Sequence, residues 1–333
     1  MPIAWISFVA LAAVIAVSGF WLLQFGDVIA ERTGLSGSWI GLALVATVTS
    51  LPEIVTGVSA VRITGAPDLA IGDALGSCVF NLALLSVMDL AYRPACMFTR
   101  ASQGHALSAG YSVVLLSLVG LSLVAPAASW GLPVSPVTLA IAPIYLLALR
   151  TIFTYERRAL IEPPEPAAAR YPEITLPRAV AGYLVCAAFV VAAGVFLPGA
   201  AERLAEAMGW SRTLVGTLFL AAATSLPELV VTLSAVRIGV VDMAVAALLG
   251  SNLFNMMALV VDDVAYVEGP LFGAASPHHL ATVITALLMT GLVTAGLIYR
   301  PASRPAGMMS WVSLALLAAY GLNAYLLFAQ AGT

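Results

Sequence analysis

Thr49-Ser-Leu-Pro-Glu53 and Thr224-Ser-Leu-Pro-Glu228 are two copies of one motif, and the second copy begins 175 residues after the first. Further matches follow them along the chain. At the same offset, Ser59-Ala-Val-Arg-Ile63 matches Ser234-Ala-Val-Arg-Ile238. At an offset of 174, Leu75-Gly-Ser77 matches Leu249-Gly-Ser251, and Phe80-Asn81 matches Phe254-Asn255. The change by one residue indicates a one-residue difference in the connecting loop. The chain therefore contains an internal repeat.

The composition is that of a membrane protein. Of the 333 residues, 61% are apolar and only 9% are charged, and the mean hydropathy is +1.01. A soluble domain carries about 25% charged residues because its surface faces water. The surface of this chain must instead face hydrocarbon. The net charge of −3, without a basic cluster, argues against a nucleic-acid partner.

Cysteines and histidines do not form a recognisable metal or disulfide pattern. The cysteines lack CxxC spacing, which favours small apolar fillers: Cys78, Cys96 and Cys186. The histidines fall at the edges of predicted segments: His105, His278 and His279. We therefore expect no His- or Cys-based metal centre and no cofactor.

Apolar runs of membrane-spanning length recur along the whole chain. A helix needs about 20 apolar residues to cross the hydrocarbon core. The polar and Pro/Gly-rich breaks predict ten spans: 3–23, 38–62, 68–92, 105–126, 131–149, 177–199, 212–237, 241–266, 278–299 and 308–330. No Arg or Lys precedes the first run, so we expect a spanning helix there and not a cleaved signal peptide.

One long polar linker divides these spans into five and five. It covers 150–178, contains Glu-Pro-Pro-Glu-Pro and is predicted to be cytoplasmic. The first repeat is then 1–149, with its most repeat-like part at about 41–92, and the second is 179–333, with 216–266. Because each half has an odd number of spans, the second must be inverted relative to the first. We predict an all-α polytopic membrane protein with ten transmembrane helices in two inverted five-helix repeats.

Arginine placement predicts the orientation, since the chain has no Lys. With the N-terminus outside, eleven of the fourteen Lys and Arg residues fall on the cytoplasmic side, and the exceptions are Arg62, Arg203 and Arg212. Positive residues concentrate on the cytoplasmic side of membrane proteins. We therefore expect both termini outside the cytoplasm, in a bacterial inner (plasma) membrane.

Glu53 and Glu228 lie well inside apolar spans, with no Lys or Arg within a helical turn. An ionised carboxylate there costs several kcal/mol unless it is paired or faces water. A bound cation would supply the missing partner. The alternative is a pair of protonated structural carboxyls that hydrogen-bond each other.

The prolines of the motif add backbone ligands. Pro52 and Pro227 have no N–H and clash with the carbonyl four residues back. The carbonyls that lose their donor are those of Val48 and Ala223, and those of Ala46 and Ala221 are near enough to turn inward. Freed carbonyls in a membrane are tolerated where they line a cavity or are otherwise engaged.

Hydroxyl and amide side chains share faces with these acids. Thr49 and Ser50 precede Glu53 by four and three residues, which places them on one helix face, and Thr224 and Ser225 repeat this before Glu228. The next helix of each half adds a pair spaced by four: Ser77 with Asn81, and Ser251 with Asn255. The neighbouring Gly76 and Gly250 would allow close helix approach. Such oxygen ligands suit Ca²⁺ or Na⁺.

At these residues the chain resembles the sodium/calcium exchanger family, within the wider cation/calcium antiporters. The resemblance rests on the two motif-bearing segments and the five-plus-five layout. It implies that Glu53 and Glu228 are central ion ligands. It further implies these ligands: Thr49, Ser50, Thr224, Ser225, Ser77, Asn81, Ser251 and Asn255, with the carbonyls of Ala46 and Ala221.

The chain departs from the family pattern one turn before each Gly-Ser. The usual Gly-Asn reads Gly72-Asp73 in the first half and Ala246-Ala247 in the second. Asp73 is in line with Ser77 and Asn81, so it is either a further ligand or a structural or vestibule residue. Asp89 and Asp263 also match at an offset of 174, and we expect them to attract cations at the two vestibules or to be ordinary interfacial residues.

The predicted function is secondary active Na⁺/Ca²⁺ exchange by alternating access, without enzymatic activity. An H⁺-coupled antiporter for Ca²⁺ or another divalent cation is the first alternative, because protons also neutralise carboxylates. A cation channel and an intramembrane hydrolase are more distant alternatives, and no nucleotide-binding GxxxxGK[ST] motif is present. The expected partners are the transported ions and the lipid bilayer, and no protein partner can be inferred.

Overall fold

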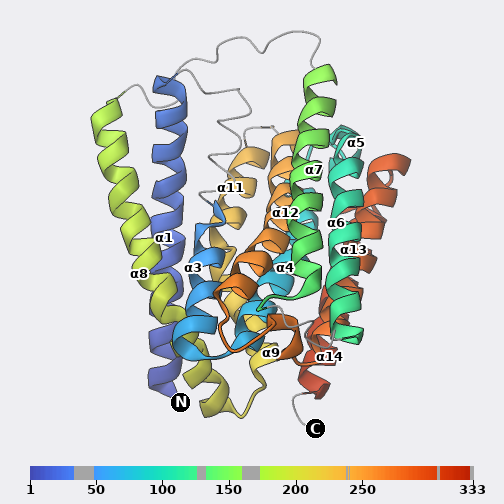
Figure 1. Ribbon diagram of the computed structural model, residues 1–333. Coiled ribbons are helices and arrows are strands. Elements are labelled where there is room, and N and C mark those ends of the chain that lie inside the picture. The colour runs from blue at the N-terminus through green and yellow to red at the C-terminus, as the bar shows by residue number, and fades with distance from the viewer. Residues whose placement is uncertain are drawn as a thin grey trace.

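The computed structural model describes residues 1–33, 49–125, 133–159, 173–237, 239, 241–305 and 308–330, and all regular structure within these ranges is helical. The elements are α1 Pro2–Arg32, α3 Leu51–Ser59, η1 Ala60–Thr64, α4 Pro67–Ala91, α5 Met97–Arg100, α6 His105–Val124, α7 Pro136–Ala159, α8 Leu176–Met208, α9 Arg212–Leu214, η2 Val215–Leu220, α10 Ala221–Thr224, α11 Leu226–Arg237, α12 Val241–Ala265, η3 Leu271–Gly273, α13 His279–Tyr299 and α14 Trp311–Gln330. Figure 1 shows the long helices side by side.

Eight helices in the described ranges are long and apolar enough to span a membrane. A ninth span would be formed by 212–224 and 226–237, which are bent by 48° at Ser225. The tenth predicted span, 38–62, is only partly described, because 38–48 lie outside the described residues. Its described part is α3 followed by the π-helix η1. The prediction of an all-helical membrane protein is confirmed, whereas the count of ten remains a prediction.

Three predicted span ends fall short of the observed helices. The run predicted for 3–23 continues in α1 to Arg32. The span predicted for 177–199 continues as α8 to Met208, with Pro198 inside the helix. Pro198 removes the donor for the carbonyl four residues back, that of Gly194, and proline is tolerated in spanning helices where such groups are engaged by their surroundings. The neighbouring Val195 carbonyl accepts the Ser59 hydroxyl at 2.6 Å. At the third predicted end, α7 runs ten residues past Leu149 to Ala159, so regular helix occupies part of the predicted linker.

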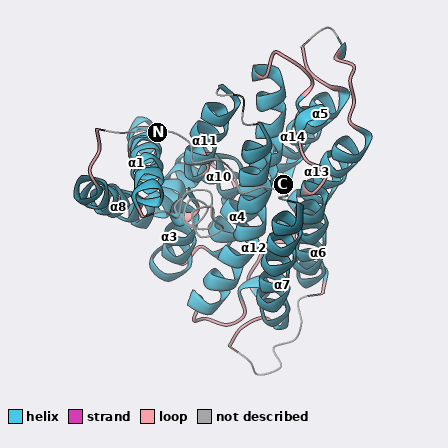
Figure 2. Ribbon diagram, turned by 90° about the horizontal axis from the view of Figure 1, so that it is seen from above, coloured by secondary structure: helices cyan, strands magenta, loops and turns pink. Residues whose placement is uncertain are grey.

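The helices form a central group with a peripheral pair. Seen from above, α4 and α12 lie in the middle, with α3, α10 and α11 on one side and α6, α7, α13 and α14 on the other (Figure 2). The peripheral helices α1 and α8 pack along each other. Their outward side chains are large and apolar, including Ile3, Leu184 and Phe196. Such a surface is suited to hydrocarbon.

Asp89 and Asp263 hold equivalent places in the two halves. Asp89 accepts the Met97 N–H at 2.8 Å and the Ser310 N–H at 2.7 Å. Asp263 accepts the Leu271 N–H at 2.6 Å and the Ser135 N–H at 2.7 Å. The hydroxyls of Ser313 and Thr138 complete the two sets.

Each of these carboxylates therefore fixes the loop after its own helix and the start of the last helix of the other half, α14 for Asp89 and α7 for Asp263. Both are fully buried. The hypothesis that Asp89 and Asp263 attract cations at vestibules is wrong for this reason, because their oxygens serve backbone N–H groups and hydroxyls. The partner residues also match between the halves, which extends the repeat to α7 and α14.

A second matched pair of contacts joins one half to the other. Asp68 at the start of α4 lies 3.0 Å from Nε2 of His279 on α13, and Asp242 at the start of α12 lies 2.8 Å from Nε2 of His105 on α6. Each aspartate also accepts a backbone N–H from the loop before that histidine. The two histidines thus tie α4 and α12 to the surrounding helices.

Candidate cation site

The two Thr-Ser-Leu-Pro-Glu motifs each place a non-helical serine directly before the start of a helix. Ser50 has φ −94° and ψ 6°, and Ser225 has φ −86° and ψ 10°, both outside the helical region. A new helix begins at the following leucine in each case, with the proline in its first turn. Because proline cannot donate to the preceding turn, the motif itself explains the break. The glutamate therefore lies one residue after the proline, in the first turn of the new helix.

Glu53 and Glu228 meet in the interior of the molecule. Their exposed fractions are 2% and 3%. They lie close enough to repel each other electrostatically, and Asp73 lies within the same range of Glu53. None of the ion pairs found between described residues includes either glutamate. The site therefore concentrates negative charge without a basic partner from the described chain.

Hydroxyl groups from both halves reach these carboxylates. Ser251 on α12 donates to Oε1 of Glu228 at 3.1 Å, and Thr49 is a further hydrogen-bond partner of Glu228. Ser225 lies 3.5 Å from Oε1 of Glu53 and 3.0 Å from the Ser77 hydroxyl. The structure thus brings the serines of the second helices into contact with the motif residues.

Asp73 also belongs to this group. Thr224 donates its hydroxyl to Oδ1 of Asp73 at 2.8 Å, and this bond joins α10 to α4. The Asp73 side chain is 1% exposed. Burial and the bond to Thr224 place Asp73 beside the motif residues and argue against an open vestibule, while both the ligand role and the structural role stay predictions.

The crossing of α4 and α12 includes a residue that sequence reasoning missed. Asn252 accepts the Asn81 amide at 3.1 Å and donates its own amide to the Cys78 carbonyl at 3.2 Å. The Cys78 thiol lies 3.7 Å from the Asn252 carbonyl, and the Asn255 amide lies 3.8 Å from the thiol. The only sequence signal for Asn252 was its place beside Ser251 in the repeated segment.

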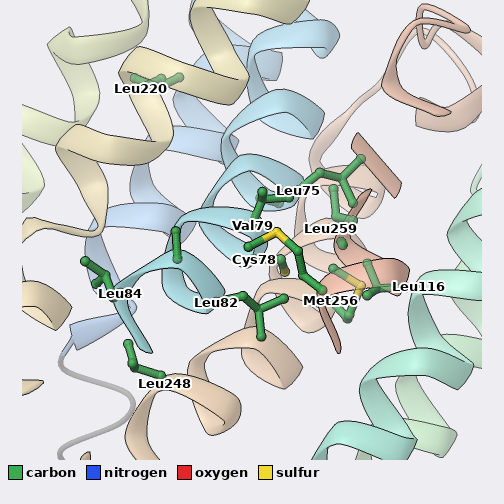
Figure 3. Close-up of a cluster of buried hydrophobic side chains, with 14 of the residues drawn as sticks. Leu75, Cys78, Val79, Leu82, Leu84, Leu116, Leu220, Leu248, Met256 and Leu259 are labelled. Carbon is green, nitrogen blue, oxygen red and sulfur yellow. The ribbon is translucent and has the colours of Figure 1, made fainter. Parts of the chain in front are cut away.

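Cys78 separates this polar crossing from an apolar cluster. Figure 3 shows it among Leu75, Val79, Leu82 and Met256. The prediction that Cys78 is a small apolar filler is confirmed on this side. The contacts with Asn252 and Asn255 give it a second role on the other side.

Several buried oxygens have no hydrogen-bond partner among the described residues. They are Oε2 of Glu53, Oε2 of Glu228, Oδ2 of Asp73, Oδ1 of Asn81, Oδ1 of Asn255 and Oγ of Ser50. Buried polar atoms are almost always hydrogen-bonded, so a shared set of orphaned acceptors indicates a place for a cation. The alternative of two carboxyls bonded to each other finds no such bond in the described structure.

The predicted backbone ligands have different outcomes. Ala46 lies outside the described residues. The Ala221 carbonyl accepts the Ser225 N–H at 3.0 Å and lies 3.2 Å from the Thr224 hydroxyl. It is therefore engaged within its own segment, although a carbonyl oxygen has two lone pairs.

The donor set combines charge with neutral oxygen. In the described ranges, no three His, Cys, Asp or Glu side chains cluster closely enough to hold a metal ion alone. A cation at this place would depend on the hydroxyls and amides as well as on the carboxylates. This combination is typical of hard cations.

Most of the chain, residues 3–151 and 178–329, matches a family model for "Sodium/calcium exchanger protein". The chain belongs to the sodium/calcium exchanger family. The recognition made from the duplicated motifs is thus confirmed, and the chain is an integral membrane protein. The two matched ranges leave out a segment within the predicted linker.

Individual relatives of this exchanger-family chain agree with that assignment. It is 25% identical over 291 residues to the inner membrane protein YrbG of Escherichia coli, covering 85% of each chain. The fold is similar to that of the H⁺/Ca²⁺ exchanger CAX, with a TM-score of 0.73, 15% identity and coverage of 98% of this chain and 85% of CAX. The sodium-calcium exchanger NCX_Mj gives a TM-score of 0.61 at 18% identity, with 96% and 97% covered.

Proposed function

We propose that this chain is a secondary active cation antiporter that exchanges Ca²⁺ for Na⁺ by alternating access around Glu53 and Glu228. The observation that carries the proposal is the pair of orphaned Oε2 atoms in a buried site without a basic partner among the described residues. A buried, unpaired charge is strongly unfavourable. A transported cation supplies the missing charge.

The charge of the site sets how it responds to ions. Two glutamates are balanced by one Ca²⁺ or by two Na⁺, so the two ions compete for the same oxygens. The loaded site is then neutral enough for the protein to change sides, whereas the empty site keeps two unpaired charges. This difference couples the two fluxes, because the unloaded protein switches slowly.

The ligand shell that we propose extends beyond the glutamates. Its neutral members are Thr49, Ser50, Ser77, Asn81, Thr224, Ser225, Ser251 and Asn255, with the carbonyls of Ala46 and Ala221. Asp73, whose carboxylate accepts the Thr224 hydroxyl, is a further proposed member at the edge of this shell, outside the charge balance of the two glutamates. Orphaned oxygens on Ser50, Asn81 and Asn255 support the inclusion of these side chains.

The architecture that we propose has ten transmembrane helices in two inverted five-helix repeats. Asp89 and Asp263 accept hydrogen bonds from corresponding residues of the two halves, and so do Asp68 and Asp242, which supports the repeat. The start of α1 and the end of α14 lie at the same end of the molecule (Figure 1). We place this end outside the cytoplasm of a bacterial inner membrane, as the arginine distribution favours.

An H⁺-coupled Ca²⁺ antiporter is the second candidate. The observation in its favour is the group of three buried acids, Glu53, Glu228 and Asp73, which protons neutralise as Na⁺ does. The two candidates share the site and differ in the driving ion.

The experiment is ⁴⁵Ca²⁺ uptake into proteoliposomes under an imposed Na⁺ gradient or an imposed H⁺ gradient. Uptake driven by Na⁺ alone supports the first candidate, and uptake driven by H⁺ alone supports the second. Glu53→Gln and Glu228→Gln are expected to abolish uptake in either case. Normal transport by both variants would refute the site, and flux without a counter-ion would indicate a channel.

A further inference from the structure

Asp262 on α12 is a buried acid that the proposed central site does not use. Its side chain is 1% exposed, and its Oδ1 has no hydrogen-bond partner among the described residues. The carboxylate lies against α3 at Gly57, where an added Cβ would come within 2.7 Å of the carboxylate carbon. Only a glycine at this position leaves room for the Asp262 carboxylate.

Asp262 and Asp73 lie toward the same end of two helices that pack together. Asp73 is six residues after the start of α4, Asp262 is three residues before the end of α12, and both of these helix ends lie at the lower end of the molecule in Figure 1. The two carboxylates are within electrostatic range of each other, as Asp73 is of Glu228. Asp73 has an orphaned oxygen of its own, Oδ2. The three acids therefore form a series that leads from the central site toward the end of α12. In the described chain, the paired arginines bind elsewhere, Arg212 with Glu202 and Arg304 near Asp89.

Neutral groups next to this series also fit a cation path. The π-helix η2 packs against α4 so closely that a Cβ on Gly72 would lie 3.0 Å from the Thr217 nitrogen. The Thr217 hydroxyl is buried and has no partner in the described part of the chain. Thr224 connects Asp73 with the motif of the central site.

The series exists in one half only. The repeat places Ala247 opposite Asp73 and Met88 opposite Asp262, while Thr232 takes the place of Gly57. The equivalent positions therefore lack both acids and the glycine that makes room for one of them. The repeat does not require the acids structurally, which points to a function on one side of the central site.

We propose that Asp73 and Asp262 form a second cation-binding station, next to the central site and on the side where α4 begins and α12 ends. It takes the same hard cations as the central site, because carboxylate oxygens are its charged ligands. This side is the lower end in Figure 1. The proposal rests on the proposed antiport function and gives the two access routes unequal affinities.

Equilibrium dialysis of the purified full chain against ⁴⁵Ca²⁺ in Na⁺-free buffer tests the station. Asp262→Asn is expected to bind about one Ca²⁺ fewer per chain at saturation than the unchanged protein. Asp242→Asn is the matched control, because it removes the same charge from the same helix at a carboxylate paired with His105. It is expected to bind the full amount. Full binding by Asp262→Asn would overturn the station.

Glu228→Gln separates this test from that of the antiport site. If Asp262→Asn binds normally while Glu228→Gln does not, the station is refuted and the central site stands. If Glu228→Gln binds Ca²⁺ normally, the central site is refuted, and the proposed antiport function is refuted with it.

Sided transport provides a second readout that a purely structural defect would not produce. Asp262→Ser removes the same charge with a smaller side chain and is used alongside Asp262→Asn, in case the latter does not fold. Each variant is expected to weaken apparent Ca²⁺ affinity roughly tenfold from the side where α4 begins. Affinity from the opposite side is expected to stay unchanged. Equal weakening from both sides would contradict the station.

Discussion

The side-chain amide of Asn252 donates to the backbone carbonyl of Cys78 at 3.2 Å, and these two residues occupy equivalent positions in the repeat. The Cys78 thiol lies 3.7 Å from the Asn252 carbonyl in return. The helices α4 and α12 therefore meet at one matched pair of residues. Asn81 and Asn255, the proposed ligands on either side of the crossing, contact this same pair.

Asn252→Ala should destabilise the crossing. The change leaves the buried Cys78 carbonyl and the Asn81 amide without their partner, and each such loss costs about 1–3 kcal/mol. Thermal unfolding in detergent should show a clear decrease in midpoint. Asn323→Ala is the comparison, because Asn323 is also buried but neither side-chain polar atom has a described partner. An equal loss in both variants would contradict the special role of Asn252.

Ser251→Ala should weaken Ca²⁺ binding without unfolding the protein. The hydroxyl donates to Oε1 of Glu228, and a hydrogen bond to a charged group contributes about 1.5–3 kcal/mol. We expect apparent Ca²⁺ affinity to fall by at least about tenfold, as measured by ⁴⁵Ca²⁺ binding. Ser234→Ala removes an exposed hydroxyl that bonds only within its own helix, and it should bind normally. Unchanged affinity in Ser251→Ala would remove this residue from the shell.

Asp89→Asn and Asp263→Asn should affect stability and not ion affinity. Each carboxylate accepts two backbone N–H groups and a hydroxyl, so its replacement costs about 1–3 kcal/mol or more. The unfolding midpoint is expected to fall in both variants. Apparent Ca²⁺ affinity of the folded fraction is expected to remain normal. A selective loss of affinity would restore the vestibule role.

Gly76→Ala should separate α4 from η2. A Cβ at Gly76 would meet the Thr217 carbonyl and come 2.7 Å from the Ala221 Cβ. Because backbone cannot move aside as a flexible side chain does, overpacking of about 1–3 kcal/mol is expected. Gly110→Ala, where the added atom would meet nothing within 4 Å, is the control for unfolding measurements. A neutral Gly76→Ala would show that η2 can shift without cost.

The histidine contacts should differ in strength although they match in sequence. His279 is fully buried, whereas Asp242, the partner of His105, has a side chain that is 55% exposed. Exposed pairs contribute little because water screens them. We therefore expect His279→Gln to lower the unfolding midpoint more than His105→Gln. Equal effects would indicate that solvent exposure does not distinguish the two contacts.

That the chain is a helical membrane protein, and where its candidate cation site lies, was largely predictable from the sequence. Apolar runs of spanning length and the matched motifs are local patterns that need no knowledge of distant contacts. The same holds for Glu53 and Glu228, because an acid in an apolar span with no nearby base stands out by itself. Helix ends were less predictable, as Pro198 shows, because a proline ends some helices and is accommodated inside others, depending on the packing around it.

By itself, the sequence determined that the chain is a helical membrane protein of this family, with a duplicated acidic motif. Only the tertiary structure decided which of its polar groups are satisfied. It assigned Asp89 and Asp263 to loop and helix ends, added Asn252 to the crossing, and set the Asp262 carboxylate against Gly57. These outcomes depend on contacts between the halves or between distant helices. Spacing along one helix determines which side chains share a face of that helix, whereas packing across the molecule determines which other residues that face contacts.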